Sequence, residues 1–211
     1  MYQNSISKIA RYGSLAMLLV TAGCAVQKTA PNLQETSAVV EIPAEAQRQY
    51  GEALMELETG EFAAAAAQFE LFVQHYPDYA AAYINLAIIH VQQERDNDAL
   101  LMLSRALEID STNPVALNQL GLLKRRSGDF AAAEKAWRSA IEANPDYAYA
   151  WYNLGVLYDL YLQNLPAALE HYQAYQDLGD SADSDVTVAR WIADLKSRIG
   201  DPPQTAQVRE L

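Results

Sequence analysis

The sequence repeats itself at intervals of 34 residues across most of its length. Side chains of the same type or size recur at this interval in five columns. The columns are Tyr83, Leu117 and Trp151; Leu86, Leu120 and Leu154; Ala87, Gly121 and Gly155; Ala65, Ala99 and Ala133; and Phe69, Leu103 and Trp137. A unit of this size cannot bury its own apolar face, so successive units are expected to stack into one continuous array.

Each repeat predicts a pair of α-helices, which we name helix A and helix B. On helix A, a large residue is followed by Leu three positions on and by a small residue four positions on, which places all three on one face. On helix B, Ala133 and Trp137 form an (i, i+4) pair on the facing stripe. The Ser-Gly-Asp turn at residues 127–129 separates the helices, and Pro77 and Pro145 end helix B. The predicted pairs cover residues 44–76, 79–110, 114–144 and 148–177.

Composition agrees with an all-helical array. The 211 residues include only 9 Gly and 8 Pro, and Ala, the strongest helix former, occurs in runs.

After an acidic loop at residues 178–185, apolar residues recur at helical spacing and predict a capping helix over residues 186–199, followed by a tail at 200–211. These residues are Val188, Ile192, Leu195 and Ile199. The predicted fold class is an all-α solenoid of about four helix pairs plus a C-terminal capping helix, and this capping helix is expected to face solvent.

The repeated columns resemble the tetratricopeptide repeat (TPR), with the pattern W-x2-L-G-x2-Y, then A-x3-F, then P. The best matches are LNQLGLLKRRSGDFAAAEKAWRSAIEANP at residues 117–145 and WYNLGVLYDL at residues 151–160. This resemblance implies a TPR domain over residues 44–177. The sequence departs from the family pattern at Gln49 and Glu52 in the first repeat, and an extra residue, placed within 161–166, lengthens the fourth.

The first 23 residues predict a signal peptide. Lys8 and Arg11 form a basic start, and residues 13–23 are an apolar or small-residue run. At about 1.5 Å per residue this run is too short to cross a hydrocarbon layer of roughly 30 Å. The segment is therefore interpreted as a secretory leader and not as part of the fold.

The residues around Cys24 resemble the lipobox of bacterial lipoproteins. Residues 20–24 read Val-Thr-Ala-Gly-Cys, and the resemblance implies cleavage before Cys24 and a lipidated N-terminal cysteine that carries palmitate. Ala25 stands where an Asp would retain such proteins in the inner membrane, which implies an outer-membrane location facing the periplasm. Residues 24–43 would be a flexible tether that reaches on the order of 60 Å. The alternative is an ordinary signal peptide cut near a cysteine.

Charge and motif content argue against several classes of function. The formal net charge is −12, so no clustered basic face for nucleic acid is expected. His75, His90 and His171 are too far apart to form an i, i+4 metal pair, and no metal site or cofactor is predicted. The sequence has no glycine-rich phosphate loop and no nucleophile elbow. The prediction is a protein that is not an enzyme.

The TPR resemblance implies a concave face lined by helices A, and this face is the candidate partner-binding site. Carried over position by position, the candidate residues are Tyr50, Leu54, Ile84, Asn85, Ile88, Asn118, Gln119, Leu122, Arg125, Tyr149, Tyr152, Asn153 and Val156. These side chains are mainly apolar and tyrosine-rich, which favours an amphipathic helix or an apolar peptide as the protein partner. The alternative is that Ile88, Leu122 and Val156 are buried between neighbouring helices and contact no partner.

Together these features predict a non-catalytic, lipid-anchored TPR adaptor. Its resemblance to pilotins and related pilus-biogenesis lipoproteins implies a role in pilus or secretin biogenesis, and other similar lipoproteins act as scaffolds for peptidoglycan hydrolases. Further alternatives are a structural component of an envelope complex, assembled through the convex face or Trp191 of the capping helix, and a glycan-binding accessory. The basic run at residues 124–126 is explained by cations near a helix C-terminus or by an acidic patch on a partner.

Overall fold

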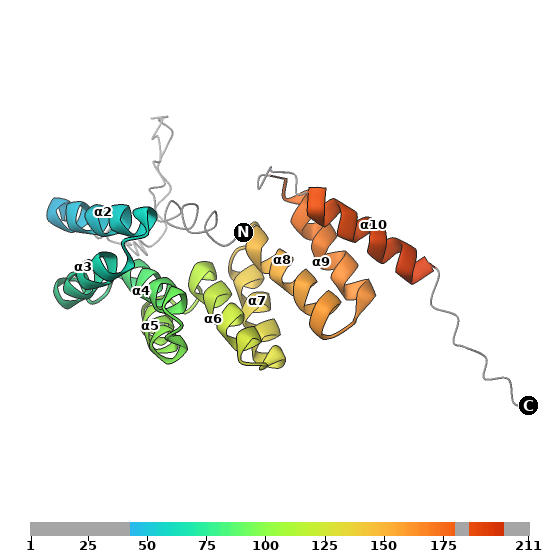
Figure 1. Cartoon of the computed structure of the whole chain (residues 1–211), viewed down its shortest axis with the longest axis horizontal. Helices are drawn as coiled ribbons and strands as arrows, with labels where there is room; N and C mark the ends of the chain where they lie inside the picture. The colour runs from blue at the N-terminus through green and yellow to red at the C-terminus, as the bar shows by residue number, and fades with distance from the viewer. Residues whose placement is uncertain (1–42, 180–185, 201–211) are drawn as a thin grey trace, which may run out of the picture. The chain divides into compact units, whose positions relative to one another are not determined.

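The computed structural model describes residues 43–179 and 186–200, and within these ranges it is helical and contains no strand (Figure 1). The predicted fold class is confirmed by helices that alternate in pairs. The chain divides into two compact units, Met1–Pro77 and Asp78–Leu211, which are described separately below as unit one and unit two. The leader, Cys24 and nearly all of the tether lie outside the described residues, as do residues 180–185 and the tail from 201 onward.

Unit one contains α2 (Ala44–Thr59) and α3 (Phe62–His75). Gly60 ends α2 with a φ of 84°, a left-handed conformation that glycine adopts without steric cost. The facing sides of the two helices bury Leu57, Phe69 and Phe72, so this pair has an apolar interior of its own.

Unit two continues the alternation of helices A and B. Its elements are α4 (Ala80–Gln92), α5 (Asp96–Ile109), α6 (Pro114–Arg126), α7 (Phe130–Ala143), α8 (Ala148–Val156), the π-helix η1 (Leu157–Tyr161), α9 (Leu165–Asp177) and α10 (Val186–Gly200). Each helix A packs against the helix B that follows it, and α10 packs against α9. No helix in the described part of the chain is both long enough and apolar enough to span a membrane.

Side-chain caps fix where several of these helices begin. Asn113 Oδ1 accepts hydrogen bonds from the backbone N–H groups of Val115 and Ala116, both at 3.1 Å, next to Pro114 in the first turn of α6. Asp129 caps α7 through the N–H of Ala132. The caps explain why helices begin at these residues and not a turn earlier or later.

Small residues on helices A sit beneath large residues on helices B. Trp137 of α7 lies over Gly121 of α6, and Tyr172 of α9 lies over Gly155 of α8. Both large side chains are almost fully buried. The close approach that the repeat columns predicted is therefore present in both of these pairs.

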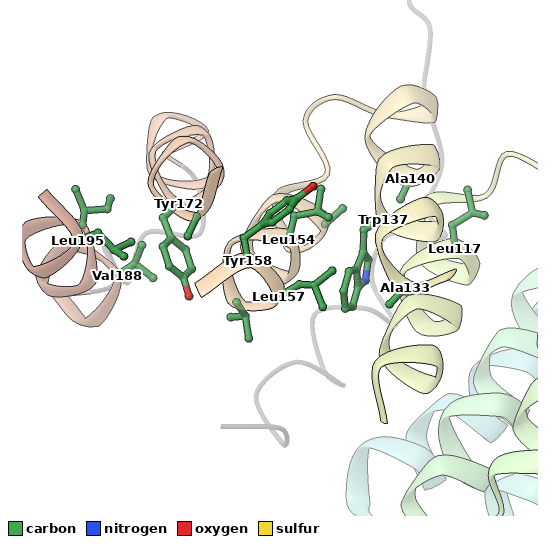
Figure 2. Packing of buried hydrophobic residues seen from close by; sticks show 14 residues of the cluster. Leu117, Ala133, Trp137, Ala140, Leu154, Leu157, Tyr158, Tyr172, Val188 and Leu195 are labelled. Carbon is green, nitrogen blue, oxygen red and sulfur yellow. The ribbon is translucent and has the colours of Figure 1, made fainter. Parts of the chain in front are cut away.

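One apolar cluster runs through α6, α7, α8, α9 and α10 (Figure 2). Trp137, Leu154, Leu157 and Tyr172 fill its middle, and Leu195 of α10 lies at its far end. The capping helix was expected to face solvent. It instead buries three of its four periodic apolar residues against the repeats, and only Ile199 is exposed.

The fourth repeat accommodates its extra residue by widening helix A into a π-helix. The N–H of Leu162 bonds the carbonyl of Leu157 at 3.0 Å, five residues earlier, and the N–H of Asn164 bonds the carbonyl of Tyr158 at 2.8 Å. Gln163 then takes a φ of 52° to reach α9. The sequence placed the extra residue within 161–166, whereas the change in helical register begins at Leu157.

Candidate functional site

Helices A of unit two, α4, α6 and α8, contact one another in series and carry most of the predicted partner-binding residues. Tyr50 and Leu54 lie on α2 in unit one and are half-buried there. Tyr50 packs against Phe69 and Phe72, with ring centroids 5.5 Å apart in both pairs. Tyr50, which is a predicted partner-binding residue, therefore also packs into the apolar interior of unit one.

The predicted partner-binding residues divide into two sets by exposure. Seven are buried: Ile84, Asn85, Ile88, Asn118, Gln119, Asn153 and Val156. Six are half-buried: Tyr50, Leu54, Leu122, Arg125, Tyr149 and Tyr152. A buried side chain offers almost no area to a ligand, so the candidate contact surface of unit two narrows to the four half-buried residues on its helices A.

Two of the buried amides hold neighbouring helices A together. Asn153 Nδ2 donates to Asn118 Oδ1 at 2.8 Å, joining α8 to α6. The backbone carbonyl of Asn118 also accepts from Trp137 Nε1 at 3.2 Å. The sequence analysis assigned these amides to a partner, and the structure gives Asn118 and Asn153 an additional role in repeat-to-repeat packing, since a buried polar group needs a hydrogen bond.

The half-buried residues flank this amide pair along the same helix faces. Leu122 and Arg125 follow Asn118 by four and seven positions on α6, and Tyr149 precedes Asn153 by four on α8, so helical periodicity places them on the Asn118–Asn153 face. Leu122 offers an aliphatic surface and Tyr149 a phenol whose ring contacts that of Tyr147 at 5.9 Å. Such a face can bind an apolar segment and orient it through hydroxyl groups.

Tyr152 belongs to an aromatic cluster that the sequence analysis missed. Its ring lies 5.4 Å from that of Tyr175 and 6.2 Å from that of Trp191, and Trp191 lies 5.4 Å from Tyr172. Trp191 thus packs the capping helix onto the fourth repeat, and it is not an isolated anchor for another protein. The sequence does contain a feature that predicts this packing, because Trp191 stands three residues after Val188 and so lies on the apolar side of the capping helix.

The three cations at residues 124–126 have different surroundings. Arg126, at the end of α6, forms an ion pair with Asp96, at the start of α5 in the preceding repeat. The guanidinium of Arg125 lies 6.0 Å from the Trp137 ring and 5.6 Å from the Tyr161 ring, within cation–π range. Within the described residues neither Lys124 nor Arg125 has an ion pair.

A polar network joins α7 to the π-helix. Tyr158 Oη donates to Glu134 Oε1 at 2.6 Å, and Arg138 Nη2 donates to Tyr158 Oη at 2.8 Å. Burial is the main cause that raises the pKa of Tyr158, and the hydrogen bond to Glu134 is the second cause. The same hydrogen bond lowers the pKa of Glu134. A neutral phenol beside an ionised carboxylate and a guanidinium is a structural link between repeats three and four.

His171 is the buried titratable group nearest this network. Its ring stacks on Tyr158 with centroids 5.2 Å apart and lies 5.6 Å from the ring of Trp151. Burial lowers the pKa of His171, which keeps the imidazole neutral near neutral pH. No cluster of His, Cys, Asp or Glu in residues 43–179 and 186–200 has the arrangement that a metal ion requires.

The family assignment agrees with this architecture of paired helices. A family model described as tetratricopeptide repeat matches residues 50–114 and 118–183, which together exceed half of the chain. The protein therefore belongs to the tetratricopeptide repeat family. Repeats of this family are protein-binding modules, and a solved structure of the first TPR of Spaghetti (RPAP3) carries a bound HSP90 peptide.

The curated relatives match less than half of this chain. The chain is 33% identical over 93 residues to the CTR9 homolog of Arabidopsis thaliana, which is 44% of this chain and 8% of that protein. The chain spans no more than 15% of the length of that protein and of three other curated relatives. Their activities therefore describe much larger proteins.

Two solved structures show the likeness of the fold. The pilF protein of Pseudomonas aeruginosa superposes with a TM-score of 0.65 at 21% identity, covering 74% of this chain and 69% of that one. YrrB, described as a TPR protein with an unusual peptide-binding site, gives a TM-score of 0.56 at 24% identity, covering 69% of this chain and 74% of that one. At these identities the likeness establishes the fold alone.

Proposed function

We propose that this protein is a non-catalytic adaptor that binds a protein segment on the Asn118–Asn153 face of its helices A and is held at the outer membrane by an acyl chain on Cys24. The observation that carries the binding proposal is the placement of Leu122, Arg125 and Tyr149 on one face of unit two, beside the buried Asn118–Asn153 bond. The bond fixes the spacing of α6 and α8, so the half-buried side chains form a preorganised surface.

The chemistry of this surface supports an apolar or amphipathic segment as the partner. A leucine and a tyrosine supply apolar area, and the tyrosine hydroxyl can bond a backbone group. Only one cation lies among the half-buried candidates of unit two, so a partner held chiefly by its carboxylate would find little charge to bind there. Membership of a protein-binding family and the peptide-binding relatives support the same class of ligand.

A role in pilus or secretin biogenesis is the specific pathway that we propose. It rests on the lipobox-like residues before Cys24, the resemblance to pilus-biogenesis lipoproteins and the likeness of fold to pilF. The anchor would keep the adaptor, and whatever it binds, at one membrane. Confinement of this kind raises the effective concentration of a bound partner without any new contact.

Photo-crosslinking in cells tests the binding surface. A benzoylphenylalanine placed at Leu122 or Tyr149 is expected to form one discrete adduct with a protein partner, and the Leu122→Glu and Tyr149→Glu variants are expected to weaken capture at least tenfold. The physical reason is that a charge at the centre of an apolar contact must be desolvated without a counter-ion. Adducts are identified by mass spectrometry of purified crosslinked envelopes.

The matched control for this test is Leu101 on α5, an exposed leucine on a helix B. A probe at Leu101 should give no adduct, and Leu101→Glu should leave capture within twofold of the native chain. An adduct at Leu101 together with none at Leu122 or Tyr149 would reject the helix A face and favour assembly through the outer face. Ile84 is unsuitable as a test position, since it is buried and a Glu there would disturb folding.

Metabolic labelling with an alkyne analogue of palmitate tests the anchor. The native chain expressed in a Gram-negative bacterium is expected to take up the label, and Cys24→Ser, which has no thiol to carry the lipid, is expected to take up none. On a density gradient the native chain should travel with the outer membrane and Ala25→Asp with the inner membrane. An unlabelled native chain would remove the anchor from the proposal and leave the binding surface unaffected.

A further inference from the structure

Three consecutive large apolar residues are exposed where the fourth repeat turns from helix A to helix B. Leu160 is 66% exposed, Tyr161 is 44% exposed and Leu162 is 40% exposed. We refer to these three residues as the Leu160 patch. Single exposed apolar residues are ordinary, but a run of three is unfavourable for solubility unless it has a function.

The patch is a product of the extra residue in this repeat. The equivalent turns of unit two are polar, with Gln-Glu-Arg at residues 93–95 and Ser-Gly-Asp at 127–129. In the fourth repeat the π-helix Leu157–Tyr161 extends helix A. Apolar residues therefore occupy the turn between helix A and helix B, where the other repeats of unit two have polar residues. π-helical turns of this kind occur often at functional sites.

A cation without an ion pair lies beside the patch. The guanidinium of Arg125 is 5.6 Å from the Tyr161 ring centroid, and the ring centroid of Phe130 is 5.0 Å from that of Tyr161. Lys124 precedes Arg125 on α6, and in the described residues neither has a carboxylate partner. Most other arginines of unit two, such as Arg95 and Arg138, are paired with acids, which sets this corner apart in a chain of net charge −12.

We propose that the Leu160 patch, the adjacent Arg125 and Lys124, which precedes Arg125 in sequence, bind a protein segment in which apolar side chains alternate with carboxylates. The apolar side chains would cover Leu160 and Leu162, and a carboxylate would bond the Arg125 guanidinium above the Tyr161 ring. Charge complementarity favours this partner, because carboxylates are the counter-ions that these two cations lack.

A membrane surface fits the same corner less well. Anionic headgroups would repel a chain with a net charge of −12, and two cations are few against that charge. Arg125 is also half-buried beside two aromatic rings, so its guanidinium is placed to receive one carboxylate and not to protrude into a headgroup layer. The proposal does not depend on the acyl anchor, and it shares only Arg125 with the helix A face.

Fluorescence anisotropy with the purified full chain tests the proposal. The probes are a labelled peptide in which Leu and Phe alternate with Glu, and the same peptide with every Glu replaced by Lys. We expect the Glu peptide to bind at least tenfold more tightly than the Lys peptide. Leu160→Asp and Tyr161→Asp should weaken binding of the Glu peptide at least tenfold, and Lys124→Glu should reduce the preference for Glu over Lys at least fivefold.

Leu101→Asp is the matched control, because Leu101 is also an exposed leucine and lies on α5, away from this turn. It should change the affinity for the Glu peptide less than twofold, and circular dichroism should show that all four variants keep the helical content of the native chain. Equal loss in Leu101→Asp and Leu160→Asp would mean that the peptide does not bind at the patch.

Three other results would overturn the proposal. The first is no measurable binding of the Glu peptide, or equal binding of the Lys peptide. The second is binding to phosphatidylglycerol vesicles that Leu160→Asp abolishes, which would assign the patch to a membrane. The third is a dimer in sedimentation equilibrium that Leu160→Asp dissociates, which would assign the patch to a second copy of this chain. Crosslinking at Leu122 and Tyr149 reports on the helix A face separately, so either proposal can fail alone.

Discussion

Replacing Trp137 by Ala is expected to lower the free energy of unfolding by about 3–5 kcal/mol, the usual cost of truncating a fully buried aromatic residue. Trp137 is fully buried at the centre of the apolar cluster, over Gly121. Its indole N–H bonds the backbone carbonyl of Asn118 at 3.2 Å, and the Arg125 guanidinium lies 6.0 Å from its ring. The substitution removes the packing, the hydrogen bond and the cation–π contact together. Urea unfolding of the full chain, followed by circular dichroism, measures the loss.

Trp151→Ala provides the same substitution at a less buried tryptophan. Its indole N–H bonds the carbonyl of Pro145 at 2.8 Å, and its ring is half-buried near His171. One hydrogen bond and partial burial predict a loss of about 1 kcal/mol. If Trp151→Ala destabilised the chain as much as Trp137→Ala, the apolar cluster around Trp137 would not be the main source of stability in unit two.

The 34-residue period was sufficient to predict the helix pairs, because the period reports how each helix A meets its own helix B. Gly121 beneath Trp137 is the clearest case, since a small residue and a large one recur at fixed positions and can only be explained by close approach. The structure adds the caps Asn113 and Asp129 at the starts of α6 and α7, which the sequence analysis did not use although they are also local in sequence. These features are local in sequence, so the sequence alone contains them.

The burial of the candidate site could not be predicted in the same way. Whether Ile88 or Asn118 lies open or buried depends on how closely neighbouring helices A approach, and no column of the repeat measures that distance. The Asn118–Asn153 bond joins residues 35 positions apart, one more than the repeat period, so aligned columns do not reveal it. The π-helix and its exposed Leu160 patch come from a single extra residue, whose position within the turn the sequence left open.

Gly155→Ala is expected to destabilise the protein by about 1–3 kcal/mol, although Ala is the better helix former. A Cβ added at Gly155 would lie 2.5 Å from Cε1 and 3.0 Å from Cγ of Tyr172, well inside van der Waals contact. Tyr172 is nearly fully buried and packs against Trp191, so its ring cannot move aside without disturbing the capping helix. Urea or thermal unfolding of the full chain measures the change.

Gly51→Ala is the control that isolates the steric effect, because the substitution is identical and also lies within a helix. A Cβ at Gly51 would meet no atom within 4 Å, so only the helix propensity changes, and a gain of about 0.5–1 kcal/mol is expected. The two variants should therefore shift stability in opposite directions. If Gly155→Ala were neutral or stabilising, α8 and α9 would not be in the close contact that the tetratricopeptide pattern and the structure both require. The apolar cluster would then have to tolerate an added methyl group, contrary to the dense packing of protein interiors.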